Sequence, residues 1–277
     1  MTVLEVLQST TAYFVKRKVE SPRLNAEHLM AHALDRKRIE LYLDFERVLT
    51  ETELAPLREL VRRRGQGEPL QHLLGTVEFC GHIFLCDKRA LIPRPETEEL
   101  VELLLKSEGS RARICDVGTG SGVIALSLAA ALPNAEVCAI DFAEEALSLA
   151  RENATRLGLS ERVRFIQSDL LAQVAERFDL IVANLPYVPE TDRTTSSREV
   201  LHDPHGALFG GQVGDEIIRK LIEAAPAHLQ PGGLLALEIG INQAEGLSTF
   251  LADHGYHDIS GRQDFDGVTR FLLAKHG

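Results

Sequence analysis

Hydrophobic positions recur with helical spacing along the first 75 residues. The apolar side chains that follow this spacing are Val3, Val6, Leu7 and Phe14, then Leu29, Met30 and Ala33, and then Leu54, Leu57, Leu60 and Val61. The pattern predicts three amphipathic helices with a shared core, the third of which ends at Gly65. The basic run Arg62, Arg63 and Arg64 predicts a solvated helix end. We therefore expect residues 1–75 to form a small helical bundle.

After residue 75 the hydrophobic pattern changes. Short apolar pieces interrupted by Gly81 predict a β-hairpin linker over residues 76–90. Residues 91–277 alternate strand and helix patterns. The predicted elements are strands over 113–116, 136–140, 163–167, 178–183 and 234–238 and helices over 99–105, 123–131, 143–157 and 215–229, followed by one helix and two strands. Such alternation predicts an α/β fold, with a doubly wound, mostly parallel sheet covered by helices on both faces.

Two segments interrupt this alternation. Pro231, Gly232 and Gly233 predict a turn between the helix over 215–229 and the next strand. Residues 188–214 have no hydrophobic periodicity, and a loop of this length in a compact domain is typically functional or mobile. The second segment is therefore a candidate functional segment.

The composition is that of an ordinary soluble enzyme. No run approaches the roughly 20 apolar residues that span a bilayer, and because polar residues interrupt the first apolar stretch we expect no secretory signal. The four cysteines are Cys80, Cys86, Cys115 and Cys138. They have no CxxC spacing, which favours reduced, buried thiols. The ten histidines include no HExxH motif, so we expect no metal site. We expect a cytoplasmic protein without membrane contact, and we take a monomer as the default.

The net charge of −11 is unevenly distributed. Residues 1–75 contain 12 Lys and Arg against 11 Asp and Glu, which leaves 18 against 30, a net charge of −12, for residues 76–277. A surface this acidic repels phosphate backbones and tolerates basic protein partners. The distribution argues against direct contact between the second part and nucleic acid.

A glycine-rich turn follows the first predicted strand of the α/β part. Glycine occupies positions 118, 120 and 122, whereas the dinucleotide-binding pattern GxGxxG needs glycine where Val123 stands. The turn therefore favours a ligand without a phosphate over NAD. Asp116 precedes the turn and can face an ammonium group, and Asp141 ends the next strand and can accept both hydroxyls of a ribose. Open α/β sheets bind ligands at such strand ends.

A second candidate site follows the strand over 178–183. Its residues are Asn184, Leu185, Pro186 and Tyr187. An amide side chain, backbone carbonyls and an aromatic face are the groups that hold a planar NH2, whose delocalised lone pair must be oriented rather than deprotonated. We expect the Asn184 side-chain oxygen and the Leu185 carbonyl to accept its N–H groups while Tyr187 stacks on it. With the glycine turn, this segment predicts methyl transfer to a planar nitrogen.

The turn and the strand-end carboxylates resemble those of the class I S-adenosylmethionine-dependent methyltransferases. The resemblance implies S-adenosylmethionine as donor and S-adenosylhomocysteine as product. It implies a site for the methionine part lined by Gly118, Thr119, Gly120, Ser121 and Gly122. By the same resemblance Asp116 lies at the donor, Asp141 holds its ribose, and Asp169 and Leu170 flank its adenine, with Asn184 close to the donor.

Segments along nearly the whole chain resemble the HemK/PrmC family. They are GEPLQHLLG over 67–75, LIPRPETE over 91–98, PGG over 231–233, EIG over 238–240 and DFDG over 264–267. The resemblance implies a front domain, residues 1–75, that helps to bind a protein substrate. It also implies methylation of the glutamine side-chain amide in the Gly-Gly-Gln motif of bacterial peptide chain release factors 1 and 2.

The family pattern at the acceptor segment is NPPY, and Leu185 replaces its first proline. Leu185 keeps a backbone carbonyl, and Pro186 biases it towards an extended conformation. The fixed φ of a proline is lost, and Leu185 gains an N–H that needs a partner. We expect activity to persist, with Asn184, Pro186 and Tyr187 as catalytic residues and all four residues binding the substrate.

Two other functions remain open. An adenine amino-group methyltransferase on DNA or RNA would use the same chemistry, but duplex DNA requires base flipping and a positive surface, which the acidic second part disfavours. An inactive adaptor that binds release factors is the second alternative, because Leu185 departs from the family pattern at the acceptor segment. The intact glycines and Asp141 argue against that loss of activity.

Overall fold

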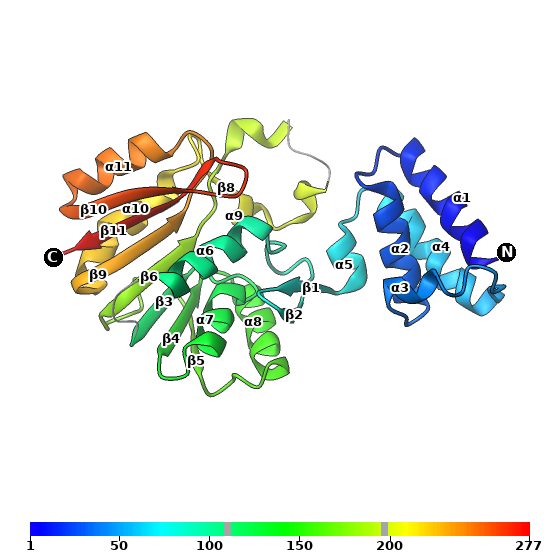
Figure 1. The fold of residues 1–277 in the computed structure, drawn as a ribbon. Helices are drawn as coiled ribbons and strands as arrows, with labels where there is room; N and C mark the ends of the chain where they lie inside the picture. The colour runs from blue at the N-terminus through cyan, green and yellow to red at the C-terminus, as the bar shows by residue number, and fades with distance from the viewer. Residues whose placement is uncertain (108–111, 195–198) are drawn as a thin grey trace. The chain divides into compact units, whose positions relative to one another are not determined.

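The computed structural model describes residues 1–107, 112–194 and 199–277. They divide into two compact units. One comprises Met1–Thr76 with residues 199–202, and the other comprises the remaining described residues from Val77 onward. The first unit is helical, and the second is an α/β domain with a seven-stranded sheet (Figure 1). The predicted fold class is confirmed.

The helical unit has five helices in its described residues up to Thr76. They are α1 (Val3–Lys16), α2 (Pro22–Ala33), α3 (Arg38–Leu41), α4 (Glu51–Gly65) and α5 (Leu70–Leu74). A capping box begins α1, because the Glu5 N–H donates to Thr2 Oγ1 at 3.2 Å and the Thr2 N–H donates to Glu5 Oε2 at 2.8 Å. Two otherwise unpaired backbone donors are thereby satisfied where the helix starts.

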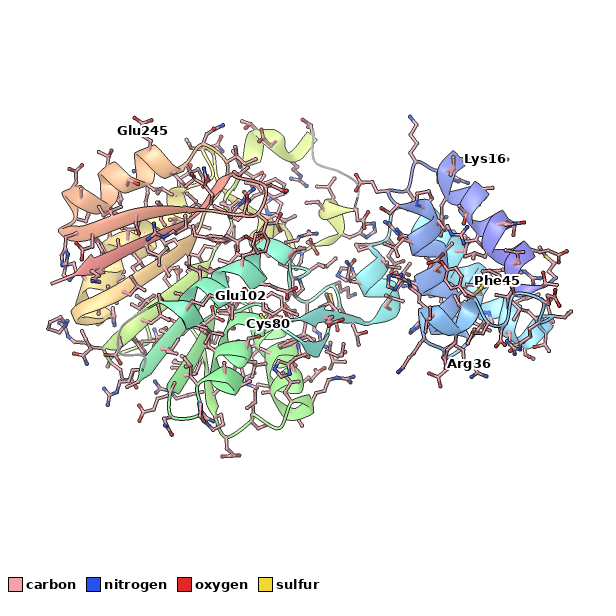
Figure 2. The ribbon with its side chains drawn as sticks, in the orientation of Figure 1. Lys16, Arg36, Phe45, Cys80, Glu102 and Glu245 are labelled. Carbon is pink, nitrogen blue, oxygen red and sulfur yellow. The ribbon has the colours of Figure 1, made fainter. Side chains whose placement is uncertain are left out.

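The core of this unit consists largely of the residues that the helical spacing predicts. Its buried members from that pattern are Val3, Val6, Leu7, Phe14, Leu29, Met30, Leu54 and Leu57, with Ala33, Leu60 and Val61 packed partly buried against them. Charged side chains such as Lys16 and Arg36 lie on the outside of the unit (Figure 2). The amphipathic stripes thus identify the buried faces of α1, α2 and α4.

Arg64 contradicts the predicted solvated helix end. Only 3% of this residue is exposed, and its guanidinium donates to Asn25 Oδ1 at 2.7 Å, to the Glu68 carbonyl at 3.1 Å and to Glu199 Oε2 at 2.8 Å. Arg62 and Arg63 keep 54% and 40% of their side chains exposed. The prediction is therefore wrong for Arg64, which is a buried cation with hydrogen-bonding partners.

The chain beyond residue 75 contains the following elements. They are β1 (Thr76–Phe79), β2 (His82–Leu85), α6 (Pro95–Lys106), β3 (Arg113–Val117), α7 (Val123–Ala131), β4 (Glu136–Asp141), α8 (Glu144–Arg156), β5 (Val163–Gln167), β6 (Phe178–Asn184), β7 (Val188–Pro189), the 3-10 helices η1 (Glu190–Thr194) and η2 (Val200–His202), α9 (His205–Leu208), β8 (Phe209–Gly211), α10 (Glu216–Ala224), the 3-10 helix η3 (Ala225–His228), β9 (Leu229–Glu238), α11 (Ala244–Asp253), β10 (Tyr256–Gln263) and β11 (Thr269–His276). The first two strands pair with each other, as expected for a hairpin.

The large sheet has the strand order β10-β11-β9-β6-β3-β4-β5. Neighbouring strands from β9 to β5 are parallel, whereas β11 is antiparallel to both β9 and β10. Helices α10 and α11 pack on one face, and α6 and α7 pack on the other (Figure 1). The exposed Glu102 on α6 and Glu245 on α11 lie on the outer sides of these two layers (Figure 2). Burial on both faces explains why the central strands are almost continuously apolar.

The segment Pro231, Gly232 and Gly233 lies within β9 and does not separate a helix from a strand. Phe178 pairs with Leu229 and Leu180 pairs with Leu234, so two steps along β6 correspond to five steps along β9 and three residues bulge out. The preceding helix, α10, ends at Ala224 and is followed by the 3-10 turn η3. The predicted turn is therefore a bulge inside one strand.

No helix of the described ranges is long and apolar enough to cross a membrane. All four cysteines are free thiols. Cys86, Cys115 and Cys138 are buried, as predicted, whereas Cys80 is only half-buried.

Replacement of the buried cation should destabilise the helical unit. We expect Arg64→Ala to lower the free energy of unfolding by roughly 2–4 kcal/mol, because Asn25 and the Glu68 carbonyl lose a charged donor in a buried site. The matched control Arg62→Ala removes an exposed ion pair with Glu59 and should cost less than about 1 kcal/mol. Urea unfolding followed by circular dichroism gives both values. Equal midpoints for the two variants would contradict the assigned role of Arg64.

Candidate active site

The polar side chains of the candidate site share one face of the sheet. Within β6, Leu180 and Val182 contact the core under α6 and α7, whereas Ile181 contacts the core under α10 and α11. Because side chains alternate along a strand, Asn184 is directed to the α6 side. Glu238 is its register partner on the parallel strand β9 and follows the same rule. The carboxyl ends of two adjacent strands thus place an amide beside a carboxyl group.

The glycine-rich turn is bound to the end of β4. The Gly118 and Thr119 N–H groups both donate to the Ile140 carbonyl at 2.8 Å. The Gly120 N–H donates to Asp141 Oδ2, also at 2.8 Å. These bonds bring the turn and Asp141 together, although about 20 residues separate them in the sequence.

Asp141 retains acceptor capacity after making these bonds. Its Oδ2 accepts the Gly120 N–H, and its Oδ1 accepts the Ala143 N–H at 2.9 Å. Burial raises the pKa of Asp141 above its ordinary value even though these N–H bonds lower it. Each oxygen has a further lone pair, so the carboxylate can accept two more hydrogen bonds, for example from two hydroxyl groups.

The last residues of the turn connect it to α7 and α8. Ser121 is buried, and its carbonyl accepts an N–H of Asn153 on α8 at 2.9 Å. The Gly122 N–H donates to the Thr119 carbonyl at 2.9 Å, and α7 begins at the next residue. Backbone contacts on both sides therefore hold the turn in one conformation.

Asp116 is completely buried on β3. Its Oδ2 accepts the Thr119 hydroxyl at 2.6 Å and the Ala125 N–H at 3.1 Å, whereas its Oδ1 has no partner among the described residues. Burial raises its pKa to about 7, despite the opposing effect of these two bonds. A carboxyl oxygen that is buried and unpartnered fits a cationic or N–H group of a ligand.

The segment after β5 lies against the end of β4. The Ser168 N–H donates to the Asp141 carbonyl at 3.0 Å. Asp169 is exposed, and Leu170 packs partly buried on the core with a φ of 49°. The structure thus brings Asp169 and Leu170 to the same sheet edge as the glycine turn.

The Leu185 side chain lies on the opposite face of the sheet from that of Asn184. Its side chain is 5% exposed and belongs to the core under α10 and α11. It covers Gly118, where a Cβ would lie 2.7 Å from Leu185 Cδ2 and where φ is +75°. The left-handed backbone favours glycine at position 118, and a Cβ there would displace the end of the Leu185 side chain. The Leu185 side chain therefore has a packing role, and only the Leu185 backbone carbonyl is a candidate for binding the acceptor.

Asn184 and Tyr187, both partly buried, meet in a polar cluster with the buried residues Thr97 and Glu238, which the sequence did not predict. Asn184 Nδ2 donates to Thr97 Oγ1 at 3.0 Å, and the Thr97 hydroxyl donates to Glu238 Oε2 at 2.8 Å. The Tyr187 hydroxyl donates to Glu238 Oε1 at 3.4 Å. Burial raises the pKa of Glu238 to about 7, and the nearby Arg270 opposes this shift. Pro186 completes the segment between these anchored residues.

The segment over 188–214 has more structure than its lack of periodicity predicts, although its residues 195–198 lie outside the described ranges. Strands β7 and β8 pair in parallel. A Cβ at Gly210 would lie 2.3 Å from the Pro186 carbonyl oxygen and 2.2 Å from that of Gly214. Gln243 adds a further restraint, because its Nε2 donates to the Tyr187 carbonyl at 3.0 Å. The end of this segment therefore supports the backbone of the acceptor residues.

Asp203 fixes another part of the same segment. It is buried, its Oδ1 accepts the Ile92 N–H at 3.3 Å, and its Oδ2 accepts Arg94 Nη2 at 2.8 Å. Ile92 and Arg94 belong to the IPRPETE stretch that precedes and begins α6. The ion pair thus holds the start of α6, which carries Thr97, to the segment beyond η2.

Sequence reasoning missed Thr97, Arg94, Asp203, Gln243 and the support from Gly210. Thr97 and Arg94 lie in the LIPRPETE stretch that carries the family resemblance, and Glu238 ends the strand predicted over 234–238. The sequence does carry one indication for Glu238, which is a charged residue at the end of an apolar strand next to the strand of Asn184. Within the described ranges, no three His, Cys, Asp or Glu side chains are grouped as metal ligands.

Comparison with known proteins defines the class. Residues 5–75 match the model of the PrmC N-terminal domain, and residues 108–237 match that of a methyltransferase domain. A methyltransferase from Pyrococcus furiosus shares the fold, with a TM-score of 0.51 and 23% identity over 68% of this chain and 88% of that one. The α/β unit with its glycine turn and strand-end polar groups is that of a methyltransferase.

Two curated relatives identify the family. The release factor glutamine methyltransferase of Geobacter sulfurreducens is 40% identical, over 100% of this chain and 97% of that protein. That of Deinococcus radiodurans is 41% identical, over 99% of both. The chain belongs to the release factor glutamine methyltransferase family, and the resemblance to HemK/PrmC proteins is confirmed.

Gly210 should be intolerant of any side chain. We expect Gly210→Ala to lower the free energy of unfolding by about 1–3 kcal/mol, because a Cβ overlaps two backbone carbonyls that cannot move independently. The matched control is Gly206→Ala in α9, where a Cβ meets no atom within 4 Å and alanine favours the helix. Thermal unfolding compares the two. A Gly210→Ala midpoint as high as that of the control would show that the close approach is absent.

Proposed function

We propose that the protein methylates the side-chain amide nitrogen of the glutamine in the Gly-Gly-Gln motif of bacterial peptide chain release factors 1 and 2, with S-adenosylmethionine as donor. The names of the full-length relatives support a glutamine of a release factor as the methylated residue. The observation that carries the proposal is the position of Asn184. It leaves β6 beside the glycine turn that leaves β3, because the residues before them, Ala183 and Val117, are register partners in parallel strands.

The residues at the turn fit S-adenosylmethionine. When bound, this donor supplies an electrophilic methyl group on a positively charged sulfur. The unpartnered Oδ1 of Asp116 suits its ammonium group, and the spare lone pairs of Asp141 suit the ribose hydroxyls. Asp169 and Leu170 are assigned to the adenine. Phe142, which is 74% exposed next to Asp141, offers a further aromatic face for that ring.

Residues of the acceptor segment orient the substrate amide. Asn184 Nδ2 is already bound to Thr97, which leaves the Asn184 side-chain oxygen to accept an N–H of the glutamine. The Leu185 carbonyl accepts the other N–H, and Tyr187 packs on the flat amide. Held in this way, the nitrogen lone pair faces the methyl group. The nitrogen gains the methyl group and then loses a proton, and S-adenosylhomocysteine is the second product.

The helical unit is proposed to bind the release factor. Ile39 on α3 and Leu43, two residues beyond the end of α3, are 68% and 82% exposed, and we assign these apolar side chains to contact with the release factor. We assign residues 1–75 to substrate binding, residues 76–90 to the linker and residues 91–277 to catalysis. The net charge of −12 over residues 76–277 suits a basic protein substrate better than nucleic acid.

Methyl transfer can be measured directly. Incubation with labelled S-adenosylmethionine and purified release factor should label the glutamine of the Gly-Gly-Gln motif, as located by mass spectrometry. Asn184→Ala should lower turnover at least about 100-fold, because the amide loses its main orienting acceptor, while donor affinity stays nearly unchanged.

Other results of this assay point to other functions. If the labelled methyl group appears in added nucleic acid but not in the release factor, the result would favour an adenine methyltransferase. Tight binding of the factor with no label in either substrate would favour an adaptor. Undiminished turnover in Asn184→Ala would remove Asn184 from the mechanism.

Donor binding should depend on pH through Asp116. Its raised pKa of about 7 means that the free protein holds a proton there below pH 7, and the ligand ammonium favours the ionised form. Affinity for S-adenosylhomocysteine should therefore fall about tenfold per pH unit below 7 and level off just above it.

Calorimetry between pH 5.5 and 7.5, in two buffers of different ionisation enthalpy, measures the affinity and the released proton. Asp116→Asn should bind more weakly at pH 7.5 and should lose the pH dependence. If the slope persists in this variant, Asp116 is not the group that titrates.

A further inference from the structure

Asn184 lies at one end of a buried hydrogen-bond relay, which we define as Asn184, Thr97 and Glu238. The two bonds of the relay measure 3.0 Å and 2.8 Å. Thr97 and Glu238 are only 2% and 1% exposed, so water does not compete for their polar atoms. The members come from three separate elements, namely β6, α6 and β9. Each position is therefore fixed by packing around a different element.

The backbone around the relay is firmly held. Asn184 and Glu238 are register partners on adjacent parallel strands. Thr97 lies in the first turn of α6, where Pro95 begins the helix and Arg94 is bonded to the buried Asp203 at 2.8 Å. The three side chains are thus held at fixed positions, and what can change is the direction of the hydrogen bonds between them.

The chemistry of the three groups sets the direction of the bonds. An ionised Glu238 can only accept, so the single O–H of Thr97 must point at it. The Thr97 oxygen then offers only lone pairs to Asn184, which must turn its NH2 towards Thr97. The Asn184 carbonyl oxygen consequently faces the opposite way. An outward-facing acceptor is the group that an N–H of a primary amide needs.

We propose that Thr97 and Glu238 are positioning residues that set the orientation of the Asn184 amide, so that Asn184 presents a hydrogen-bond acceptor and selects an NH2-bearing substrate. This role rests on the function proposed above. Neither residue is assigned a contact with the substrate or the donor. Glu238 reaches the acceptor segment twice, through Thr97 to Asn184 and through the 3.4 Å bond from the Tyr187 hydroxyl.

The relay should reverse when Glu238 is protonated. A neutral carboxyl group can donate to Thr97, and Thr97 can then donate to the Asn184 oxygen, which turns the NH2 towards the substrate. Burial raises the pKa of Glu238 to about 7, Arg270 on β11 and the bonds from Thr97 and Tyr187 lower it, and Glu96 on α6 raises it. The acceptor orientation is therefore favoured above about pH 7 and is lost below it.

Steady-state kinetics with release factor test this role. Thr97→Val removes the hydroxyl at nearly constant shape and should lower kcat roughly 10- to 100-fold, whereas Thr97→Ser should restore most of it. Glu238→Gln should lower kcat at pH 8 and flatten the rise of kcat between pH 6 and 8. Donor affinity should change by less than about threefold in all three variants. The matched control Thr249→Val, on the exposed face of α11, should behave as the unmodified protein.

A second measurement needs no substrate. The side-chain NH2 resonances of Asn184, assigned by their loss in Asn184→Asp, should titrate with a midpoint near pH 7 and stop doing so in Glu238→Gln. Asn184 NH2 chemical shifts that do not change with pH, or a Thr97→Val variant with full kcat, would contradict the proposed roles of Thr97 and Glu238. Absence of glutamine methylation by the unmodified protein would overturn the proposed function alone, because the resonances still report whether the relay exists.

Discussion

The parallel pairing of β6 between β3 and β9 is the constraint on which the rest of the structure depends. It brings the glycine turn, Asn184 and Glu238 to one edge of the sheet, and the alternation of side chains directs Asn184 and Glu238 to the face covered by α6. A register shift of one residue would turn Asn184 to the opposite face, away from Thr97. The long apolar strands are therefore as important for the site as its polar residues, because burial on both faces specifies the register.

The site is formed at a cost to the stability of the fold. Asp116 and Glu238 are almost completely buried, and burial raises the pKa of each to about 7. An unfolded chain releases these protons near pH 4, whereas the folded chain keeps them until about pH 7, so each group lowers stability as the pH rises through that window. Buried carboxyls with raised pKa values are common at functional sites, where a ligand or a positioned neighbour uses the charge. The large apolar cores on both faces of the sheet offset this cost.

Much of the fold and part of the site can be predicted from the sequence. Asp141 and Asn184 end strands that apolar runs reveal, so local pattern is enough to place them at the sheet edge. Thr97 could not be predicted as their neighbour, because 87 residues separate it from Asn184 and only the packing of α6 brings the two together. The basic run predicts a solvated Arg64, and this prediction is wrong for the same reason, since its partners Asn25 and Glu199 are 39 and 135 residues away. Hydrophobic periodicity indicates which face of an element is buried. It does not indicate which polar residues of two distant elements will form hydrogen bonds with each other.

Leu185 shows how a departure from a family pattern can be accommodated. A proline at this position would stiffen the chain through its ring, whereas the leucine side chain enters the core and covers Gly118. The acceptor segment is therefore tied to the donor turn by side-chain packing instead of by a fixed φ angle. Leu185 packs closely here because position 118 has no Cβ, so the glycine also makes room for the segment over 184–187. Leu185, the residue that departs from the family pattern, thus brings the segment over 184–187 into direct contact with the glycine turn.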